Sequence, residues 1–203
     1  MGGHSKKKLQ ALQVRQRIVF FDEFAVYDRP SLFYGWAERN TRPEVKSDER
    51  TRNKLNGLLG VDAVSGEEFF RLSPGSKTED VSEYLAELCL DCVELGYTKL
   101  CIILDNNPTH KQKMQAQLAL HLEQMGLASA ITVECLYVPC YSPKLNLVEY
   151  VIHLLRLRFL HHLPLGTTLV QIEQQLAQFL ASNQFLSAQQ VQKTLNFIFS
   201  LVA

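Results

Sequence analysis

The sequence predicts an α/β protein in which a mixed five-stranded sheet is flanked by helices, with extra helices towards the C-terminus. The chain has 203 residues, of which 46% are hydrophobic, enough to fill the core of one good-sized domain. Short apolar runs of strand length alternate with segments of helical period in the second half of the chain. The run at residues 99–104 is apolar without alternation, which is typical of a strand covered on both faces.

The first half of the chain predicts strands joined by hairpins. Apolar runs of strand length, bounded by turn residues, lie at residues 18–24, 32–37 and 55–62, with a short edge strand at 68–72. Pro74, Gly75 and Ser76 then break the chain. We interpret residues 1–16, before the first strand, as a basic N-terminal arm.

The second half predicts helices alternating with strands. Thr78, Glu79 and Asp80 cap a helix that ends near Leu95, and Gly96 is its C-cap. The remaining expected elements are strands at 99–104 and 131–138 and helices at 111–124, 146–161, 168–182 and 187–201. This element order is that of the ribonuclease-H-like fold. We assign that domain to residues 17–165 and a C-terminal helical extension to 166–203.

Charge and apolar runs exclude some classes of protein. There are 21 basic and 21 acidic residues, so net charge does not indicate a nucleic-acid binder. Local basic runs lie at residues 4–17, 39–54 and 153–162, and DNA binding would need them on one face. Neither a run of about 18 apolar residues nor a signal-peptide core occurs, so we expect no membrane partner and a cytoplasmic location.

The five cysteines predict packing rather than chemistry. Cys89 and Cys92 have the spacing of a zinc or redox pair, but they share the apolar face of the helix expected at 78–95. A second such pair, which a zinc site would need, is missing from the sequence. An odd number of cysteines in a cytosolic chain also argues against disulfides.

Three carboxylates follow strand-like runs and form the candidate site. Asp22 follows Ile18–Phe21, Asp105 follows Leu100–Leu104, and Glu149 follows a loop after the strand expected at 131–138. An acidic side chain at the edge of a buried strand is costly unless it has a partner. Three such groups could hold a pair of divalent cations, since Mg²⁺ prefers oxygen ligands.

These residues also carry a family resemblance. Asp22-Glu23, Asp105-Asn106-Asn107-Pro108-Thr109-His110 and the run from Tyr141 to Glu149 resemble the catalytic core of mariner-type DDE transposases, and most closely their bacterial insertion-sequence branch. The resemblance covers roughly residues 17–165, with 43 residues between Asp105 and Glu149. The sequence departs from the family in having Leu147 in place of proline and Val151-Ile152-His153 where a tryptophan often follows the glutamate.

The resemblance implies a function and its partners. Asp22, Asp105 and Glu149 would be catalytic and would hold two Mg²⁺ or Mn²⁺ ions for cleavage of transposon ends and strand transfer into a TA-type DNA target. A helix-turn-helix region normally precedes this core, but only about 16 residues precede the first expected strand. We therefore expect either the second frame of a split gene, with a separate helix-turn-helix polypeptide from an upstream frame, or a truncated copy. A homodimer is the other expected protein partner. Two other readings stay open: a remnant that binds DNA or oligomerises without catalysis, and a ribonuclease-H-like nuclease with another nucleic-acid substrate.

Further polar residues are expected to support the carboxylates or to contact DNA: Glu23, Asn106, His110, Ser142 and Asn146. Strand neighbours point to opposite faces, so Asp22 and Glu23 cannot both face the site. The resemblance selects Asp22, and Glu23 would then face solvent or a salt bridge. His110 could cap the next helix, contact phosphate or orient a carboxylate, and Asn146 is a candidate N-cap.

Other features have simpler explanations. We attribute Asp28 and Asp62 to turns, and we do not expect His161 and His162 to bind a metal together. The apolar face of the helix at 168–182, with Leu176, either covers the sheet of its own domain or contacts another protomer.

Overall fold

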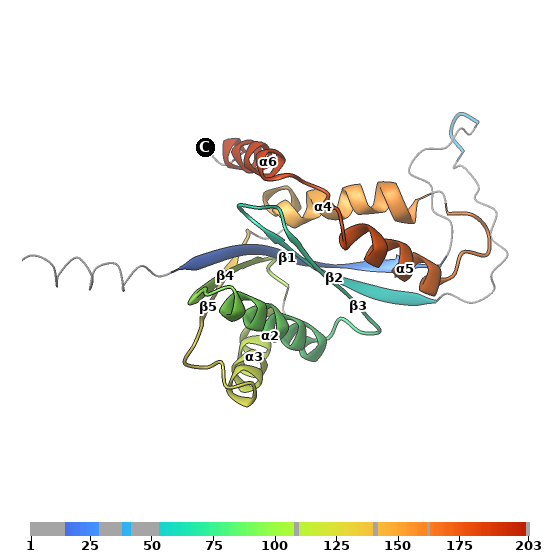
Figure 1. The fold of residues 1–203 in the computed structure, drawn as a ribbon. Coiled ribbons are helices and arrows are strands. Elements are labelled where there is room, and N and C mark those ends of the chain that lie inside the picture. Colours follow the sequence, from blue (N-terminus) through green and yellow to red (C-terminus); the bar gives the residue numbers. More distant parts are fainter. Residues whose placement is uncertain are drawn as a thin grey trace, which may run out of the picture.

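The sheet at the centre of the molecule is mixed and five-stranded. The computed structural model describes residues 15–28, 38–41, 53–107, 110–139, 142–161 and 163–201. Within these residues the strand order is β3-β2-β1-β4-β5. β1 pairs antiparallel with β2 and parallel with β4, as predicted for a mixed sheet (Figure 1). The strands are β1 (Gln16–Tyr27), β2 (Lys54–Asp62), β3 (Glu68–Ser73), β4 (Lys99–Leu104) and β5 (Thr132–Tyr137).

The first strand is longer than the sequence predicted. β1 starts at Gln16, inside the expected arm, and runs to Tyr27 because β4 pairs with its first half and β2 with most of its length. The runs at 55–62 and 68–72 form β2 and β3. The strand expected at 32–37 and most of the expected arm, residues 1–14, lie outside the described residues. The division into segments 17–165 and 166–203 stays a prediction.

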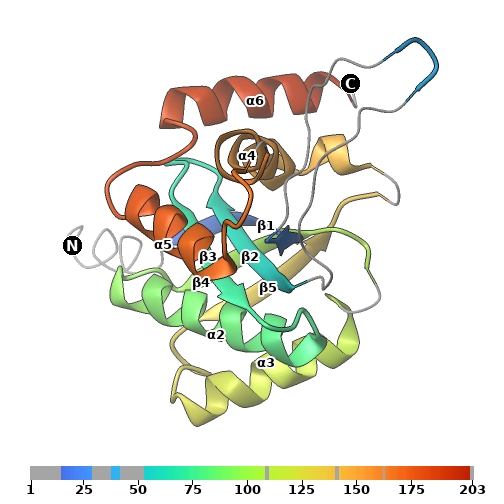
Figure 2. The same ribbon diagram turned by 90° about the vertical axis from the view of Figure 1, so that its right-hand side faces the viewer.

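Helices cover both faces of the sheet (Figures 1 and 2). Helices α2 (Thr78–Glu94) and α3 (Gln112–Gln124) lie on one face, and α4 (Leu147–Leu155), α5 (Leu169–Leu180) and α6 (Ala188–Ser200) lie on the other. Alternation along β1 divides its side chains between two cores, with Val19 and Phe21 facing α2 and Phe20 and Phe24 facing α4. A side chain on β1 therefore belongs to one layer or the other.

The ends of the helices differ in how well the sequence predicted them. Gly96 follows α2 with a φ of 80°, the left-handed conformation that glycine adopts without strain, as expected for its C-cap role. The helix expected at 146–161 is an α-helix only over Leu147–Leu155. It continues as one π-helical turn, η3 (Arg156–Leu160), at the end of which Leu160 is buried.

The C-terminal helices cover the sheet of their own chain. Ile172 and Leu176 on α5 are fully buried in the core that also contains Phe20 on β1 and Val151 on α4. Val191 on α6 is fully buried in the same core. Of the two explanations for the apolar face with Leu176, the first is confirmed.

Two smaller expectations can be compared with the structure. Cys89 and Cys92 are both fully buried in the core beneath α2, which confirms that they pack as small apolar side chains. Of the helices in the described part of the chain, none combines the length and the apolar character needed to cross a membrane.

Candidate active site

Parallel pairing of β1 and β4 brings the first two carboxylates together. The last paired residues are Phe20 and Ile103, so the same register continued by two residues places Asp22 beside Asp105. Asp105 directly follows the carboxyl end of β4, where ligands bind in open α/β sheets. β1 runs past this end because β2 still pairs with it, and Leu59 on β2 lies opposite Asp22. Asp22 therefore lies on a continuous strand, next to Asp105 in the loop after β4.

A capping asparagine brings the third carboxylate to the same place. The turn η2 (Pro143–Leu145) leads into α4, where Asn146 is the N-cap and accepts a hydrogen bond from the Val148 N–H at 3.3 Å. The Asn146 Nδ2 atom donates to the carbonyl oxygen of Phe21 at 3.2 Å, 125 residues away in the sequence. Asn146 is 1% exposed, so it joins the first turn of α4 to β1. Glu149, in that first turn, is thereby placed near Asp22.

The three carboxylates line one cleft of about 390 Å³. Of the residues expected in the site, six line it: Asp22, Asp105, Asn106, Ser142, Asn146 and Glu149. Glu23 and His110 do not line it and lie behind it. The structure thus brings together residues from β1, the loop after β4 and the start of α4.

Each aspartate has one oxygen engaged by the protein. Asp22 Oδ1 accepts the Glu23 N–H at 2.7 Å. Asp105 Oδ1 accepts the Asn107 N–H at 3.1 Å and lies 2.6 Å from His110 Nδ1. Among the described residues, the Oδ2 atoms of Asp22 and Asp105 are therefore the oxygens available to a ligand in the cleft.

Negative charge accumulates in the cleft. Burial raises the pKa of Asp22 to about 7; the Glu23 N–H opposes this rise, and the charges of Glu149 and Asp105 add to it. The same three charges that destabilise one another would stabilise a bound cation.

The donor set fits Mg²⁺ or Mn²⁺. Carboxylate oxygens are the ligands these hard cations prefer, and Mg²⁺ usually keeps several waters as well as one or two carboxylates. Among the described residues, no three His, Cys, Asp or Glu side chains already stand close enough to enclose an ion. Water or phosphate oxygens would therefore supply part of the coordination shell alongside Asp22, Asp105 and Glu149.

Behind the cleft, His110 lies between two acidic side chains. Its ring is 1% exposed, with Nε2 at 3.0 Å from Glu23 Oε1 and Nδ1 at 2.6 Å from Asp105 Oδ1. The Nδ1 contact lacks the alignment of a hydrogen bond, so we treat it as electrostatic. Burial lowers the pKa of His110, but the contacts with Glu23 and Asp105 outweigh burial and raise it. Glu23 thus forms the salt bridge expected of the opposite strand face.

Comparison with known proteins identifies the family. The model of the DDE superfamily endonucleases matches residues 17–167, about three quarters of the chain. The chain belongs to this family. No curated protein matches it.

Solved structures of a mariner transposase share the fold of this DDE chain. The Mos1 transposase paired-end complex with the left transposon end is 16% identical, with a TM-score of 0.64 over 98% of this chain and 57% of the Mos1 chain. The mariner Mos1 paired-end complex with Mg is 16% identical, with a TM-score of 0.62 over 97% of this chain and 57% of the other. The Mos1 catalytic domain is 16% identical, with a TM-score of 0.54 over 97% of this chain and 81% of that domain.

The likeness confirms the ribonuclease-H-like fold predicted for this DDE chain. The chain spans 57% of the length of the Mos1 chain in the paired-end complex. At this level of identity the likeness concerns the fold, so the activity of the whole transposase is taken up below as a proposal.

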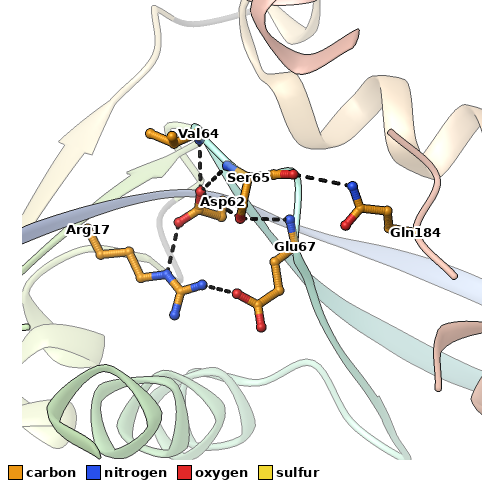
Figure 3. Close-up of polar contacts among 6 residues, drawn as sticks. All are labelled: Arg17, Asp62, Val64, Ser65, Glu67 and Gln184. Carbon is orange, nitrogen blue, oxygen red and sulfur yellow. Dashed lines mark hydrogen bonds and ion pairs between the residues drawn. The ribbon is translucent and has the colours of Figure 1, made fainter. Parts of the chain in front are cut away.

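The rival carboxylates of this DDE chain are engaged in structure elsewhere. Asp62 Oδ1 accepts the N–H groups of Val64 and Ser65 at 2.8 and 2.7 Å, and Oδ2 accepts Arg17 Nε at 2.9 Å (Figure 3). Arg17 also pairs with Glu67. Burial raises the pKa of Asp62, but these hydrogen bonds outweigh burial and lower it. The turn explanation for Asp62 is confirmed.

The other rival carboxylate, Asp28, is also engaged within the protein. Asp28 is buried and accepts a hydrogen bond from Asn53 Nδ2 at 2.6 Å. His162 lies outside the described residues, so the pair with His161 is not tested.

Sequence reasoning missed several residues around the DDE cleft. Asn107, Val138, Pro139 and Pro143 also line it. Val138 and Pro139 directly follow β5, whose carboxyl end lies beside that of β4, so the rule for strand ends could have found them. Tyr137 ends β5 and donates a hydrogen bond from its hydroxyl to the His110 carbonyl oxygen at 2.6 Å. Only the folded chain reveals that contact.

Proposed function

We propose that this chain is the catalytic domain of a DDE transposase, which cleaves DNA strands at transposon ends and joins them to target DNA. The observation that carries the proposal is the single cleft lined by Asp22, Asp105 and Glu149. Three chain segments contribute these carboxylates, and two buried polar side chains, Asn146 and His110, tie the segments to β1. Carboxylate sites of this kind, with their metal ions, serve the cleavage of phosphodiester bonds in endonucleases.

The proposed reaction has two in-line substitutions at phosphorus. In cleavage, a water oxygen bonds to phosphorus and the bond from phosphorus to the 3′ oxygen breaks. The water releases a proton to solvent, and the departing 3′ oxygen takes up a proton, which leaves a 3′ hydroxyl and a 5′ phosphate. In strand transfer, the 3′ hydroxyl oxygen bonds to a phosphorus of the target strand and releases its proton to solvent, while the 3′ oxygen of that strand departs and takes up a proton.

Asp22, Asp105 and Glu149 would hold two Mg²⁺ or Mn²⁺ ions. Bound divalent cations supply Lewis acidity at the attacking and leaving oxygens. The chain's own contribution is geometric, since the Oδ1 atoms of the aspartates are engaged by the protein and, within the residues that the structure describes, the Oδ2 atoms are the ones available to the cleft. One of the Mos1 paired-end complexes is a complex with Mg, which supports the same choice here.

Polar groups on the wall of the cleft would position the DNA backbone. Asn106 and Ser142 line the cleft beside the carboxylates, and amide and hydroxyl groups are common partners of phosphate oxygens. The exposed side chain of Lys144, in the turn before α4, adds a positive charge near the rim. Contacts with phosphate are the same for every base sequence, so these residues would hold DNA without selecting a particular sequence.

Finer parts of the proposal follow from the likeness to mariner transposases. They are a TA-type target, end recognition by a helix-turn-helix region, and a homodimer that holds two ends. The proposed location is the bacterial cytosol, at the nucleoid. Selection of transposon ends would then depend on the helix-turn-helix region, while the cleft supplies the chemistry.

The test is a nicking assay on plasmid DNA with Mn²⁺ or Mg²⁺. Wild type should convert supercoiled plasmid carrying the element's own ends to the open-circular form, and Asp105→Asn should reduce the rate at least about 1000-fold, as expected for loss of a group that binds the catalytic metals. Asp91→Asn, an exposed carboxylate on α2, is the matched control and should nick like wild type.

The outcomes separate the alternatives. Equal nicking by wild type and Asp105→Asn would show that another site cuts the DNA. A folded wild type that binds DNA but never nicks it would favour the remnant without catalysis. Cleavage of an RNA–DNA hybrid or a branched junction in preference to plasmid ends would favour the other nuclease.

A further inference from the structure

His110 spans two strands of the sheet at the wall of the site. Glu23 lies on β1 on the face opposite Asp22, and Asp105 follows β4. The ring approaches both acidic groups, at 3.0 Å and 2.6 Å, and is almost completely buried. A ring that contacts one carboxylate at each nitrogen cannot rotate without losing both contacts.

The backbone of His110 is held from a third direction. Its N–H donates to the Asn107 carbonyl oxygen at 3.0 Å, and its own carbonyl oxygen accepts the Tyr137 hydroxyl at 2.6 Å. The Tyr137 oxygen in turn accepts a hydrogen bond from Gln115 Nε2 on α3 at 2.9 Å. The side chain of Phe21 packs edge-on against the ring, with 5.9 Å between centroids.

From these contacts we propose that His110 is a positioning residue, which clamps Asp105 to Glu23 on β1 and so determines which Asp105 oxygen faces the cleft. The inference rests on the proposed function in that the cleft-facing oxygen serves a divalent cation. It assigns Glu23 a role as the anchor of the clamp and not as a cation ligand.

The geometry favours this role over direct contact with DNA. His110 does not line the cleft, and its ring is 1% exposed, so a phosphate could not reach it without opening the wall. Asp105 Oδ1 meets both His110 and the Asn107 N–H, so that, as far as the described part of the chain shows, Oδ2 is the oxygen left for the cleft. Without the clamp, the 42% exposed side chain of Asp105 could rotate.

The first measurement is Mn²⁺ affinity by titration calorimetry on chelator-stripped protein. His110→Gln and Glu23→Gln should each weaken Mn²⁺ binding by about 10- to 100-fold, the usual effect of removing a partner of a metal ligand. The double variant should bind no more weakly than the weaker single variant, because the two residues act as one clamp. His121→Ala, on α3, is the histidine control and should bind like wild type.

The second measurement needs no metal. In metal-free protein labelled at aspartate carboxyl carbons, His110→Gln should shift the ¹³C signal of Asp105, and His121→Ala should leave it in place. Glu23→Gln should shift the same signal because it releases the other end of the ring. Glu23→Gln nearly preserves side-chain volume, so it serves if the buried His110 variant does not fold.

The two measurements distinguish a failure of the proposed function from a failure of the His110 clamp. If wild type binds no Mn²⁺, the metal part of the proposed function is wrong, and the ¹³C signals alone decide the clamp. An unchanged Asp105 signal in folded Glu23→Gln or His110→Gln would overturn the clamp. So would Mn²⁺ affinities within twofold of wild type, or single losses that simply add in the double variant.

Discussion

Replacement of Asp22 by asparagine should stabilise the metal-free protein at alkaline pH. Burial raises the pKa of Asp22 from the ordinary aspartate value of 3.8 to about 7, with further contributions from the charges of Glu149 and Asp105. Each pKa unit corresponds to about 1.4 kcal/mol, so the largest possible effect is about 4 kcal/mol. Asp22 keeps some solvent exposure, and water screens part of this penalty. We expect about 2–4 kcal/mol at pH 8.

The sign follows from the protons bound in each state. The folded-state pKa of Asp22 is raised above its unfolded value, so the folded protein binds more protons between about pH 4 and pH 7. The contribution to stability is present below pH 4 and is lost as the pH rises through 7. Asp22→Asn has no such loss, and its side-chain oxygen can still accept the Glu23 N–H.

The assay is urea unfolding in chelator at pH 5, 6, 7 and 8. The wild-type free energy of unfolding should fall across this range, and that of Asp22→Asn should fall less. Glu68 is a second source of slope, because burial raises its pKa to about 7 although its carboxylate accepts the Phe185 N–H at 2.7 Å. Glu68→Gln should remove that part independently, and the double variant should keep chiefly the slope from His110, whose pKa is also raised.

One result would refute the reasoning about Asp22. If wild type and Asp22→Asn lose the same free energy between pH 5 and pH 8, then burial and the charges of Glu149 and Asp105 do not raise the pKa of Asp22 in the folded state. The site would then lack the electrostatic reason for binding a cation.

Three other predictions concern the core, the cap and DNA. Leu176→Glu should destabilise the fold by about 3–5 kcal/mol because it buries an unpaired charge. Gln178→Glu, at an exposed position of the same helix, is the control and should change the melting temperature little. A Leu176→Glu variant as stable as wild type would contradict the burial of the apolar face of α5. Asn146→Ala should lower the free energy of unfolding by about 1–3 kcal/mol and slow nicking. Loss of the Ser187 cap on α6 should lower it by about 1 kcal/mol and leave nicking normal. Urea unfolding and the plasmid assay measure the two effects. DNA binding measured by fluorescence anisotropy should be weak, non-specific and steeply reduced by salt; tight, salt-insensitive binding to one sequence would indicate an additional reading element.

Much of the fold was accessible from the sequence because local patterns specify it. The apolar run at 99–104 predicted β4 with the observed bounds, and the Asn146 cap predicted where α4 begins. The capping signals at Thr78–Asp80 predicted the start of α2, but its N-cap is Lys77, and Thr78 is the first residue of the helix. Less accessible was the length of β1, since the strand pairing that extends it to Tyr27 involves residues far along the chain. The π-helical turn at the end of α4 was also missed, because the apolar spacing of 156–160 resembles that of an ordinary helix.

For the candidate site, motifs predicted the residues but not their connections. Asp22, Asp105 and Glu149 were identified from strand ends, a helix start and the family resemblance, and the structure places all three in one cleft. The separation of Asp22 from Glu23 followed from strand alternation. That His110 is the partner of Glu23 did not follow, because a sequence pattern does not specify contacts between residues 87 positions apart.

The sequence by itself determined the types of side chain, the order of the helices and strands and the residues that could carry the chemistry, since hydrophobic period, caps and strand ends act over a few residues. The tertiary structure alone decided which groups meet. The parallel register of β1 and β4 places Asp22 beside Asp105, and the Asn146 side chain reaches Phe21 across 125 residues. It also decided that Leu176 is core, because burial of an apolar face depends on which surface packs against it.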